Sequence, residues 1–376
     1  MRIGHYAPAL WAPGGIAAFV RRLGEGQTVR GHEVTYFTSE RLAHEPHPTR
    51  TVASLSELFR AAREAPLDVL HLHKEVSSLG YGDLGNTRVV RTMHGNQASC
   101  PTGSRFLERR SQPCDRVAGL LPCTWGHVVD RCGSVRPSAV VGHLRRFRVE
   151  REVLPHLLTH TVSNFIRQRM IEAGFEPSRL VAIPSPAPVR RERPEPPPDS
   201  DPPRFACIGR VVPAKGIRWL LEAMLVSEEP YHVDVAGEGY ELDSLRHFAQ
   251  TAGLADRVIF HGWLGPTGVD ELIRRSRAVV FPSLWHEPAG LVTLEAAASG
   301  RGVVASRVGG IPEYALPEFS LLAEPNDATG LARHLDALAR DHARATRMGM
   351  EGWTLSQSRF SMGGFLDNIE GLYRMA

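Results

Sequence analysis

Two carboxylates, Glu287 and Glu295, stand on either side of the predicted start of a helix. An apolar strand over 278–283 leads into a short loop with Glu287, and a helical pattern then runs from 291 to 299. The helix start offers three free backbone N–H groups, those of Gly290, Leu291 and Val292. Such a start can bind an anion. Because carboxylates accept hydrogen bonds from hydroxyl groups, the stretch suits a ligand that combines phosphate and sugar, such as a sugar nucleotide.

Two cations, Arg210 and Lys215, lie in a second loop that follows a predicted strand over 204–210. They could neutralise a diphosphate and the charge that grows on it as a group leaves. Lysine occurs at only two positions, Lys74 and Lys215, and arginine supplies the other positive charges. A compact ammonium differs from a planar guanidinium at a phosphate site. Surface solvation is the ordinary alternative for such a pair, and the scarcity of lysine weakens it at Lys215.

The first third of the chain places candidate residues at two predicted strand ends. Gly14 and Gly15 lie between the first strand and the first helix, where backbone can approach a phosphate or substrate. His94 ends the strand over 87–94, and Asn96 follows it. A tight-turn glycine pair and a core or surface histidine remain the simpler interpretations. We expect Gly15 to contact the phosphate-bearing ligand, and Gly14 and Asn96 to lie on the side of a second ligand.

An irregular segment follows, with four cysteines and a run of arginines. The cysteines are Cys100, Cys114, Cys123 and Cys132. Four thiolates could hold structural Zn²⁺, but the intervals are too long for CxxC knuckles. A disulfide is a further alternative, and unlinked thiols in a packed insertion are the interpretation we favour. The arginine run, Arg145, Arg146 and Arg148, is either a solvated face or a contact for an anionic membrane surface or an acceptor.

The 376 residues contain two separate runs of alternating strand and helix patterns. Two such runs fit two α/β domains with doubly wound parallel sheets. We place the first domain at 1–185, a stiff proline-rich linker at 186–203 and the second domain at 204–356. One long helix is expected over 329–349. A C-terminal helix from about residue 357 to residue 376 is expected to join the first domain.

Bulk properties narrow the class of protein. A formal charge of +3 does not indicate nucleic acid as a partner. The sequence shows neither the apolar run of a signal peptide nor a stretch of about 20 apolar residues that could span a membrane. We therefore expect a cytoplasmic protein, with peripheral contact at the inner membrane face through the basic surface of the first domain as an option. The sequence leaves the oligomeric state open.

Several motifs, in order, resemble the retaining glycosyltransferases of family 4. EPAGLVTLE, over 287–295, is similar to that family's two glutamates separated by seven residues. IGRVVPAKG, over 208–216, is similar to its GR-loop-KG motif. The second half also carries VAGEG, VIFHGW, FPS and GGIPE, and the first half carries the shorter signals GG and TMHG. The resemblance is strong from 208 to 313 and looser elsewhere.

The resemblance implies the GT-B fold, in which two Rossmann-like domains face each other across an interdomain cleft that closes on the substrates. It implies that Arg210 and Lys215 stabilise the departing diphosphate and that Glu295 binds the ribose. Glu287 and His94 would contact the transferred sugar. The leaving phosphate would take the acceptor proton, so the reaction would need no enzyme nucleophile. No Asp-x-Asp motif lies near these residues, so neither metal nor cofactor is expected, and the nucleotide sugar is the donor substrate.

Three other functions stay open. A glycoside hydrolase would need carboxyls roughly 5 to 9.5 Å apart, whereas eight helical residues span roughly 12 Å, which disfavours Glu287 and Glu295 as its pair. A sugar-nucleotide 2-epimerase of the same fold would need no acceptor. A non-catalytic sugar-nucleotide-binding protein would be expected to have lost some of these charged residues. Among donors, UDP-sugars come first and GDP-mannose second; a cell-envelope glycan, a lipid-linked precursor or a natural product is the expected acceptor.

Overall fold

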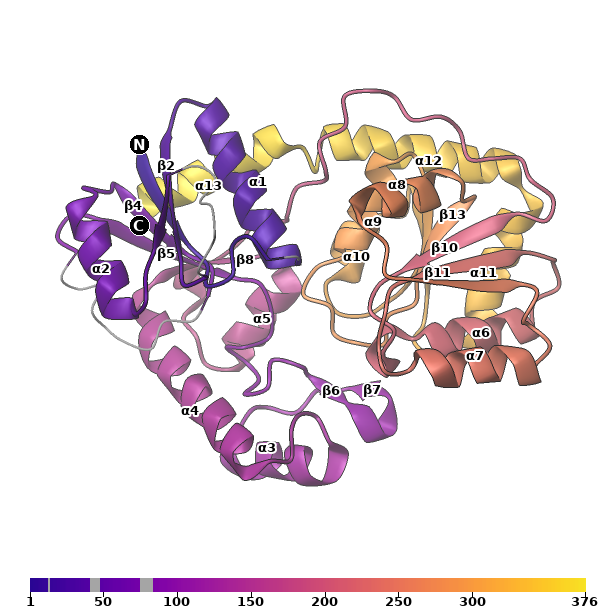
Figure 1. Cartoon of the computed structure of the whole chain (residues 1–376), viewed down its shortest axis with the longest axis horizontal. Helices are drawn as coiled ribbons and strands as arrows, with labels where there is room; N and C mark the ends of the chain where they lie inside the picture. Colours follow the sequence, from indigo (N-terminus) through magenta and orange to yellow (C-terminus); the bar gives the residue numbers. More distant parts are fainter. Residues whose placement is uncertain (13, 41–47, 75–83) are drawn as a thin grey trace. The chain divides into compact units, whose positions relative to one another are not determined.

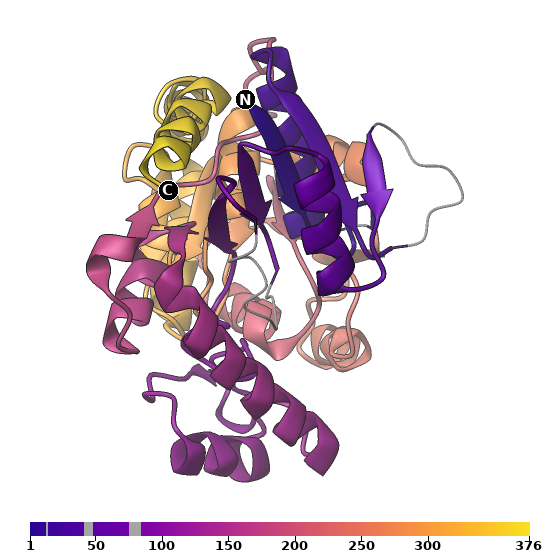
Figure 2. The same cartoon turned by 90° about the vertical axis from the view of Figure 1, so that its left-hand side faces the viewer.

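The computed structural model describes residues 1–12, 14–40, 48–74 and 84–376, and they form two compact units (Figures 1 and 2). Unit 1 comprises Met1–Ser104, Arg116–Pro184 and Gly363–Ala376. Unit 2 comprises Arg105–Asp115 and Ser185–Met362. Each unit is built on its own parallel sheet, so the predicted pair of doubly wound α/β domains is confirmed.

Unit 1 contains a seven-stranded parallel sheet in the order β3-β2-β1-β4-β5-β8-β9. Its strands are β1 (Arg2–Tyr6), β2 (Glu33–Thr38), β3 (Thr49–Thr51), β4 (Val69–Leu72), β5 (Arg88–Met93), β8 (Leu158–Thr161) and β9 (Leu180–Ala182). Its helices are α1 (Gly15–Val29), α2 (Leu55–Glu64), α3 (Leu120–Trp125), α4 (Pro137–Val153), α5 (Asn164–Glu172) and α13 (Met362–Met375). Single turns are the π-helical η3 (Gly126–Asp130) and the 3₁₀ turns η4 (Leu154–His156) and η5 (Pro177–Arg179).

Unit 2 contains a six-stranded parallel sheet in the order β12-β11-β10-β13-β14-β15. Its strands are β10 (Arg204–Ile208), β11 (His232–Ala236), β12 (Val258–Gly262), β13 (Ala278–Phe281), β14 (Gly302–Ser306) and β15 (Ser320–Ala323). Its helices are α6 (Ile217–Leu225), α7 (Leu242–Thr251), α8 (Pro266–Arg274), α9 (Leu291–Ala298), α10 (Ile311–Tyr314), α11 (Ala328–Arg340) and α12 (His342–Gln357), with the 3₁₀ turn η6 (Pro213–Lys215). Every residue of β13 and β14 is buried, as expected for parallel strands covered on both faces.

The first-domain range contains a hairpin that belongs to unit 2. Strands β6 (Phe106–Leu107) and β7 (Gln112–Pro113) pair antiparallel around the 3₁₀ turn η2 (Glu108–Arg110). Phe106 is buried in the hydrophobic core of unit 2, and Glu108 accepts a hydrogen bond from the Tyr240 hydroxyl. Residues 105–115 therefore leave the first-domain range expected from the sequence, because an aromatic anchor holds them to the other unit.

Two further segments differ from expectation. The long helix predicted over 329–349 breaks at Asp341, whose backbone leaves the helical region at φ −116° and ψ 87°. Its side chain then caps α12 by accepting a hydrogen bond from the Arg344 N–H at 2.8 Å. The expected linker over 186–203 runs along unit 2, where Arg277 donates to the Pro198 carbonyl at 3.1 Å and Arg301 donates to the Glu195 carbonyl at 2.8 Å. Extended proline-rich backbone forms no internal hydrogen bonds, so these guanidinium groups satisfy its carbonyls.

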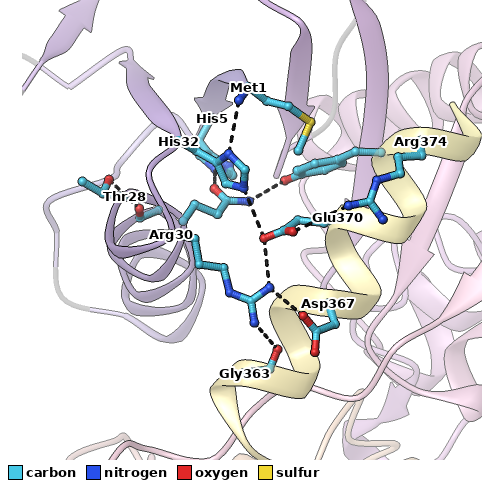
Figure 3. Close-up of polar contacts among 12 residues, drawn as sticks. Met1, His5, Thr28, Arg30, His32, Gly363, Asp367, Glu370 and Arg374 are labelled. Carbon is cyan, nitrogen blue, oxygen red and sulfur yellow. Dashed lines mark hydrogen bonds and ion pairs between the residues drawn. The ribbon is translucent and has the colours of Figure 1, made fainter.

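The last helix, α13, packs on unit 1 through a polar cluster (Figure 3). Arg30, just after α1, pairs with Asp367 at 2.7 Å and Glu370 at 3.1 Å, and donates to the Gly363 carbonyl at 2.8 Å. His32 also lies 3.2 Å from Glu370. This cluster anchors a helix whose sequence position is more than 300 residues away. Among the described residues, none of the helices has the length and apolar character needed to cross a bilayer.

Candidate functional site

The amides that the sequence predicts to bind an anion, those of Gly290, Leu291 and Val292, lie at the start of α9. Gly290 is the N-cap residue, and no side chain caps the helix. The first turn of α9 contains no acidic residue that would compete with a bound anion. Leu291 is exposed and Val292 half-buried, whereas the apolar core contains Leu294, Ala296, Ala297 and Ala298. The N–H groups of this turn are therefore a suitable place for a phosphate.

Beside this turn, Lys215 and Glu287 form an ion pair that the sequence did not predict. The Lys215 Nζ lies 2.5 Å from Glu287 Oε1, and the Ser283 hydroxyl donates to the same oxygen at 2.7 Å. Glu287 is 5% exposed. The Lys215 ammonium also lies 5.4 Å from the ring centroid of Trp285, within the range of a cation–π contact. A cation and a carboxylate assigned to separate parts of a ligand thus share one buried position.

The KG pair of the 208–216 motif brings η6 against the loop after β13. The Ala214 carbonyl accepts hydrogen bonds from the Leu284 and Trp285 N–H groups at 2.9 and 3.1 Å. Gly216 has φ +66°, and a Cβ there would lie 1.9 Å from the Pro282 carbonyl oxygen. Only glycine allows this approach, so Gly216 is what lets Lys215 reach Glu287.

A second glycine holds the other side of the Glu287 loop. Gly309 has φ +60°, and a Cβ there would lie 2.6 Å from both the backbone nitrogen and the carbonyl oxygen of Glu287. The next residue, Gly310, donates its N–H to the Glu287 carbonyl at 2.7 Å. The GGIPE motif therefore acts on the site through backbone contact.

The two remaining charged candidates of unit 2 lie outside this pair. Arg210 is exposed on the loop after β10, which is held by the Val211 N–H donating to the Glu238 carbonyl at 2.8 Å. Glu295 is half-buried on α9. Because the guanidinium of Arg210 faces solvent, it remains accessible to a ligand.

One neighbour of the site was missed by the sequence analysis. His286, directly before Glu287, has its Nε2 at 3.0 Å from Asp115 Oδ1. Asp115 ends the hairpin segment of residues 105–115 that packs on unit 2. No sequence signal links positions 171 residues apart, so only the fold shows that this segment reaches the glutamate loop.

The first-domain candidates lie in unit 1. Gly15 begins α1 and Gly14 precedes it with φ +154°, and a Cβ on either would meet no atom within 4 Å. His94 follows β5 and is half-buried, and Asn96 is buried. His94 Nε2 lies 3.1 Å from His73 Nδ1. These residues thus lie at strand and helix ends of unit 1, whereas Lys215 and Glu287 belong to unit 2.

Among the described residues, the four clustered cysteines are not brought together as a group of metal ligands. All four are described, all are free thiols, and Cys114 belongs to the segment that packs on unit 2. Within the part of the chain that the structure describes, the only group with metal-ligand geometry is His5, His71 and His73, whose ligand atoms lie within 4.8 Å of one another. The four free thiols agree with the interpretation favoured from the sequence, in which the intervals are too long for CxxC knuckles.

Comparisons with known proteins bear on the family and the fold of the chain. A family model described as Glycosyltransferase Family 4 matches residues 13–191, and one described as Glycosyl transferases group 1 matches residues 189–353. The GDP-mannose-dependent alpha-(1-6)-phosphatidylinositol monomannoside mannosyltransferase of Mycolicibacterium smegmatis is 26% identical over 91% of this chain and 90% of its own. The lipopolysaccharide core biosynthesis glycosyltransferase LpsE of Rhizobium meliloti is 31% identical over 45% of this chain and 48% of its own.

The chain spans less than two thirds of several curated relatives, among them LpsE at 48% and the uncharacterized glycosyltransferase YqgM of Bacillus subtilis at 60%. Among solved structures, Anabaena HepE in complex with UDP superposes with a TM-score of 0.74 and 16% identity, covering 100% of both chains. Its likeness shows the GT-B fold alone. Because the two family models together run from residue 13 to residue 353, the chain belongs to glycosyltransferase family 4.

Proposed function

We propose that the protein transfers a sugar from a nucleotide diphosphate sugar to an acceptor hydroxyl with retention of the anomeric configuration. The observation that carries the proposal is the ion pair of half-buried Lys215 with buried Glu287, just before the uncapped start of α9. We assign this positive charge and the amides at the start of α9 to a leaving diphosphate, which develops negative charge as the sugar departs. Glu287 holds the ammonium in place and offers its second oxygen to a sugar hydroxyl.

The other residues take roles that follow from their positions. Arg210, exposed on its loop, reaches the outer phosphate oxygens, and Glu295 accepts hydrogen bonds from the ribose hydroxyls. In unit 1, we assign His94 to the transferred sugar, Gly15 to the donor, and Gly14 and Asn96 to the acceptor. The proposed reaction does not require any of these residues to form a covalent bond with the sugar.

For the donor we propose a UDP-sugar first and GDP-mannose second. HepE was solved with UDP, and the mycobacterial relative that aligns along 91% of this chain is GDP-mannose-dependent. For the acceptor we propose a cell-envelope glycan or lipid-linked precursor, since LpsE acts in lipopolysaccharide core biosynthesis.

The direct test is a thermal-shift screen of UDP, GDP, ADP and their sugars, because a ligand that binds only the folded state raises the melting temperature. Proton NMR of the product formed from the best donor then reports the anomeric configuration. An α-linked product from an α-linked donor supports the proposal, and inversion would overturn it. Interconversion of the donor without an acceptor would show a 2-epimerase instead.

Replacing Glu295 with Ala should weaken nucleotide binding roughly 10- to 100-fold, because the ribose hydroxyls lose a charged acceptor. The turnover of saturated enzyme should change little. Isothermal titration with the nucleoside diphosphate and steady-state kinetics measure the two effects separately. An unchanged dissociation constant would remove Glu295 from the site.

Replacing Gly309 with Ala should lower turnover by about 100-fold, because the new methyl group forces the Glu287 backbone out of place. Gly265→Ala is the matched control in the same unit, since a Cβ there meets its nearest atom at 3.7 Å and its φ is −68°. Equal activities of the two variants would show that Glu287 needs no such support.

We also expect transfer to proceed in EDTA at the rate seen without it. The proposed electrophiles are Lys215, Arg210 and the α9 amides, and all of them belong to the chain. Loss of activity in EDTA that Mg²⁺ restores would contradict this assignment.

A further inference from the structure

The segment of residues 117–141 exposes an unusual share of apolar side chains. Of the seventeen large hydrophobic residues exposed among the described residues, seven lie within these 25 positions. They are Val117, Leu120, Leu121, Trp125, Val128, Val135 and Val141, with exposures of 56 to 82%. Single exposed apolar residues are normal on a soluble protein, but a concentration of this kind marks an interaction surface.

Three of these residues share one face of the α3–η3 helix. Leu121, Trp125 and Val128 follow one another at intervals of four and three positions, which brings side chains to the same side of a helix. Figures 1 and 2 show α3 and the N-terminal end of α4 extending away from the parallel sheet of unit 1. We call the segment of residues 117–148 the arm, and the apolar face sits at its far end from the sheet.

The arm has its own internal polar contacts, so the apolar face is held in shape. Asp130, 1% exposed, pairs with Arg116 at 2.6 Å. The His127 ring nitrogen lies 3.1 Å from the Ser134 carbonyl, and the Ser104 hydroxyl donates to the Cys132 carbonyl at 2.6 Å. The face is thus exposed by a folded element.

Apart from Asp130, the charges near this face in the sequence are positive. Between residues 116 and 148 there are six arginines and one carboxylate, Asp130, which is the residue already paired with Arg116. Arg131, Arg136 and Arg145 are exposed. Apolar side chains with a tryptophan, bordered by arginines, match the acyl boundary and the headgroups of an anionic bilayer. A second copy of the chain is disfavoured as the partner of this face, because it would bring arginines close to arginines.

We propose that the arm of residues 117–148 docks on the surface of a membrane that contains anionic phospholipid. Leu121, Trp125 and Val128 enter the interface, and Arg131, Arg136 and Arg145 contact the headgroups. The docking does not depend on the transfer chemistry, so it stands apart from the proposed function.

Co-sedimentation with phosphatidylcholine vesicles, with and without phosphatidylglycerol, tests the proposal. The protein should bind only the vesicles with phosphatidylglycerol. The double variant Leu121→Ser, Trp125→Ser should lose at least tenfold in vesicle affinity, and changing Arg131, Arg136 and Arg145 to Gln should cost about 100-fold. Trp263→Ser, at a tryptophan 65% exposed on unit 2, is the matched control and should bind as the unaltered protein does.

Melting temperatures and transfer to a water-soluble acceptor should stay the same in all these variants, because every changed side chain is exposed. Failure of the unaltered protein to bind either vesicle would overturn the proposal. So would binding that the variants leave intact. A concentration-dependent dimer that the Trp125 variant abolishes would assign the face to a second copy instead.

A separate observation concerns a buried hydrogen-bonded chain that ends at His94. It begins at the Ile183 carbonyl and passes through His160, Thr92, His71, Tyr373, Gln27, His5 and His73. Its eight contacts measure 2.6 to 3.1 Å. Every ring nitrogen of His5, His71 and His73 is used in it, so these rings fill their hydrogen-bonding positions without a metal ion.

The backbone carbonyl sets the direction of the whole chain. A carbonyl only accepts, so His160 donates from Nε2 and, as a neutral ring, accepts the Thr92 hydroxyl at Nδ1. Thr92 then accepts from His71 Nε2, and His71 Nδ1 accepts from the Tyr373 hydroxyl. The imidazoles are neutral because burial lowers the pKa of His160 to about 4 and that of His71 well below its usual value.

The same logic continues to the end of the chain. Tyr373 accepts from the Gln27 amide, whose oxygen accepts from His5 Nε2. His5 Nδ1 accepts from His73 Nε2, and His73 Nδ1 accepts from His94 Nε2. We infer that this chain positions His94 as the Nε2–H tautomer, with Nδ1 as a hydrogen-bond acceptor. Taken with the proposed function, His94 then recognises a sugar hydroxyl and not a phosphate oxygen.

Nitrogen-15 NMR of the ligand-free protein tests the tautomers without reference to activity. All five histidines of the hydrogen-bonded chain should carry their proton on Nε2 at pH 7.5; they are His5, His71, His73, His94 and His160. Tyr373→Phe removes the hydroxyl that orients Gln27, so His94 should become a mixture of tautomers; Tyr36→Phe, at a buried tyrosine of unit 1 outside the chain, should change nothing. An Nδ1–H or charged His94 in the unaltered protein, or a metal-bound ring, would overturn the inference. A correct tautomer with no sugar transfer would leave it standing and defeat only the proposed function.

Discussion

Replacing Lys215 with Ala should lower turnover by about 10²- to 10³-fold, the usual effect of removing one electrostatic contact to a developing negative charge. The same change leaves the Glu287 carboxylate buried beside an apolar surface without its cation. Removing one partner of a buried pair typically costs about 3 to 5 kcal/mol, so the melting temperature of unit 2 should fall as well. Steady-state kinetics and calorimetry measure the two losses.

A double-mutant cycle separates the two effects. Lys215→Ala combined with Glu287→Gln should recover much of the stability, since no charge is left buried alone, but none of the turnover. Lys215→Arg should not rescue activity, because a planar guanidinium does not fit the position of an ammonium 2.5 Å from Glu287 Oε1.

Arg218→Ala serves as the control for the ion pair. Arg218 pairs with Glu222 at 3.0 Å on α6, with about half of each side chain exposed, so its loss should cost about 0 to 1 kcal/mol. Full turnover in Lys215→Ala would refute the assigned role of Lys215.

Acidification below pH 6.5 should unfold unit 1 before unit 2. Burial lowers the pKa of His5 and of His160 from 6.5 to about 4, and burial also holds the pKa of His71, His73 and His94 well below 6.5. Between the folded and unfolded pKa values the unfolded chain binds more protons, so stability is present above pH 6.5 and is lost as the pH falls toward 4.

The expected loss of stability follows from His5 and His160, whose pKa values are lowered to about 4. Each costs about 1.4 kcal/mol per pH unit, so His5 and His160 together remove roughly 4 kcal/mol by pH 5. That is a large part of the roughly 5 to 15 kcal/mol that stabilises an ordinary domain. The positive charge of Arg91, which also lowers the pKa of His71, His73 and His94, acts in the same direction.

Amide hydrogen exchange read by strand gives the required resolution. Exchange in β1 and β4 should accelerate steeply between pH 6.5 and 5 after correction for the intrinsic rate, whereas exchange in β10 and β13 should change less. His247→Gln, at an exposed histidine of unit 2, is the control and should leave the profile unchanged. Protection of β1 that does not depend on pH would show that these histidines titrate normally.

The sequence analysis predicted the two parallel α/β units well because their strands are continuous apolar runs joined by helices of clear periodicity. It also placed Gly290 at the start of α9. It could not predict that Lys215 and Glu287 meet, because their contact depends on Gly216 lying against the Pro282 carbonyl across 66 residues of chain. Such a contact is a property of packed loops and leaves no local pattern.

The same limit explains the misses in unit 1. Histidines in three different strands gave no shared signal, since each alone is equally compatible with a surface position. The hairpin anchored by Phe106 lies inside a stretch of sequence that otherwise builds unit 1. Domain boundaries predicted from composition cannot detect a short segment that packs on the other unit.

The place of α13 also bears on how the chain folds during synthesis. Unit 1 takes its last element from residues 363–376, and that helix supplies Tyr373 to the interior and the partners of Arg30. Every residue of unit 2 lies before that helix in the sequence. Domains usually fold in the order in which the ribosome delivers them. Here the second domain has all its parts first, and the first-made domain stays incomplete until residues 363–376 have been made.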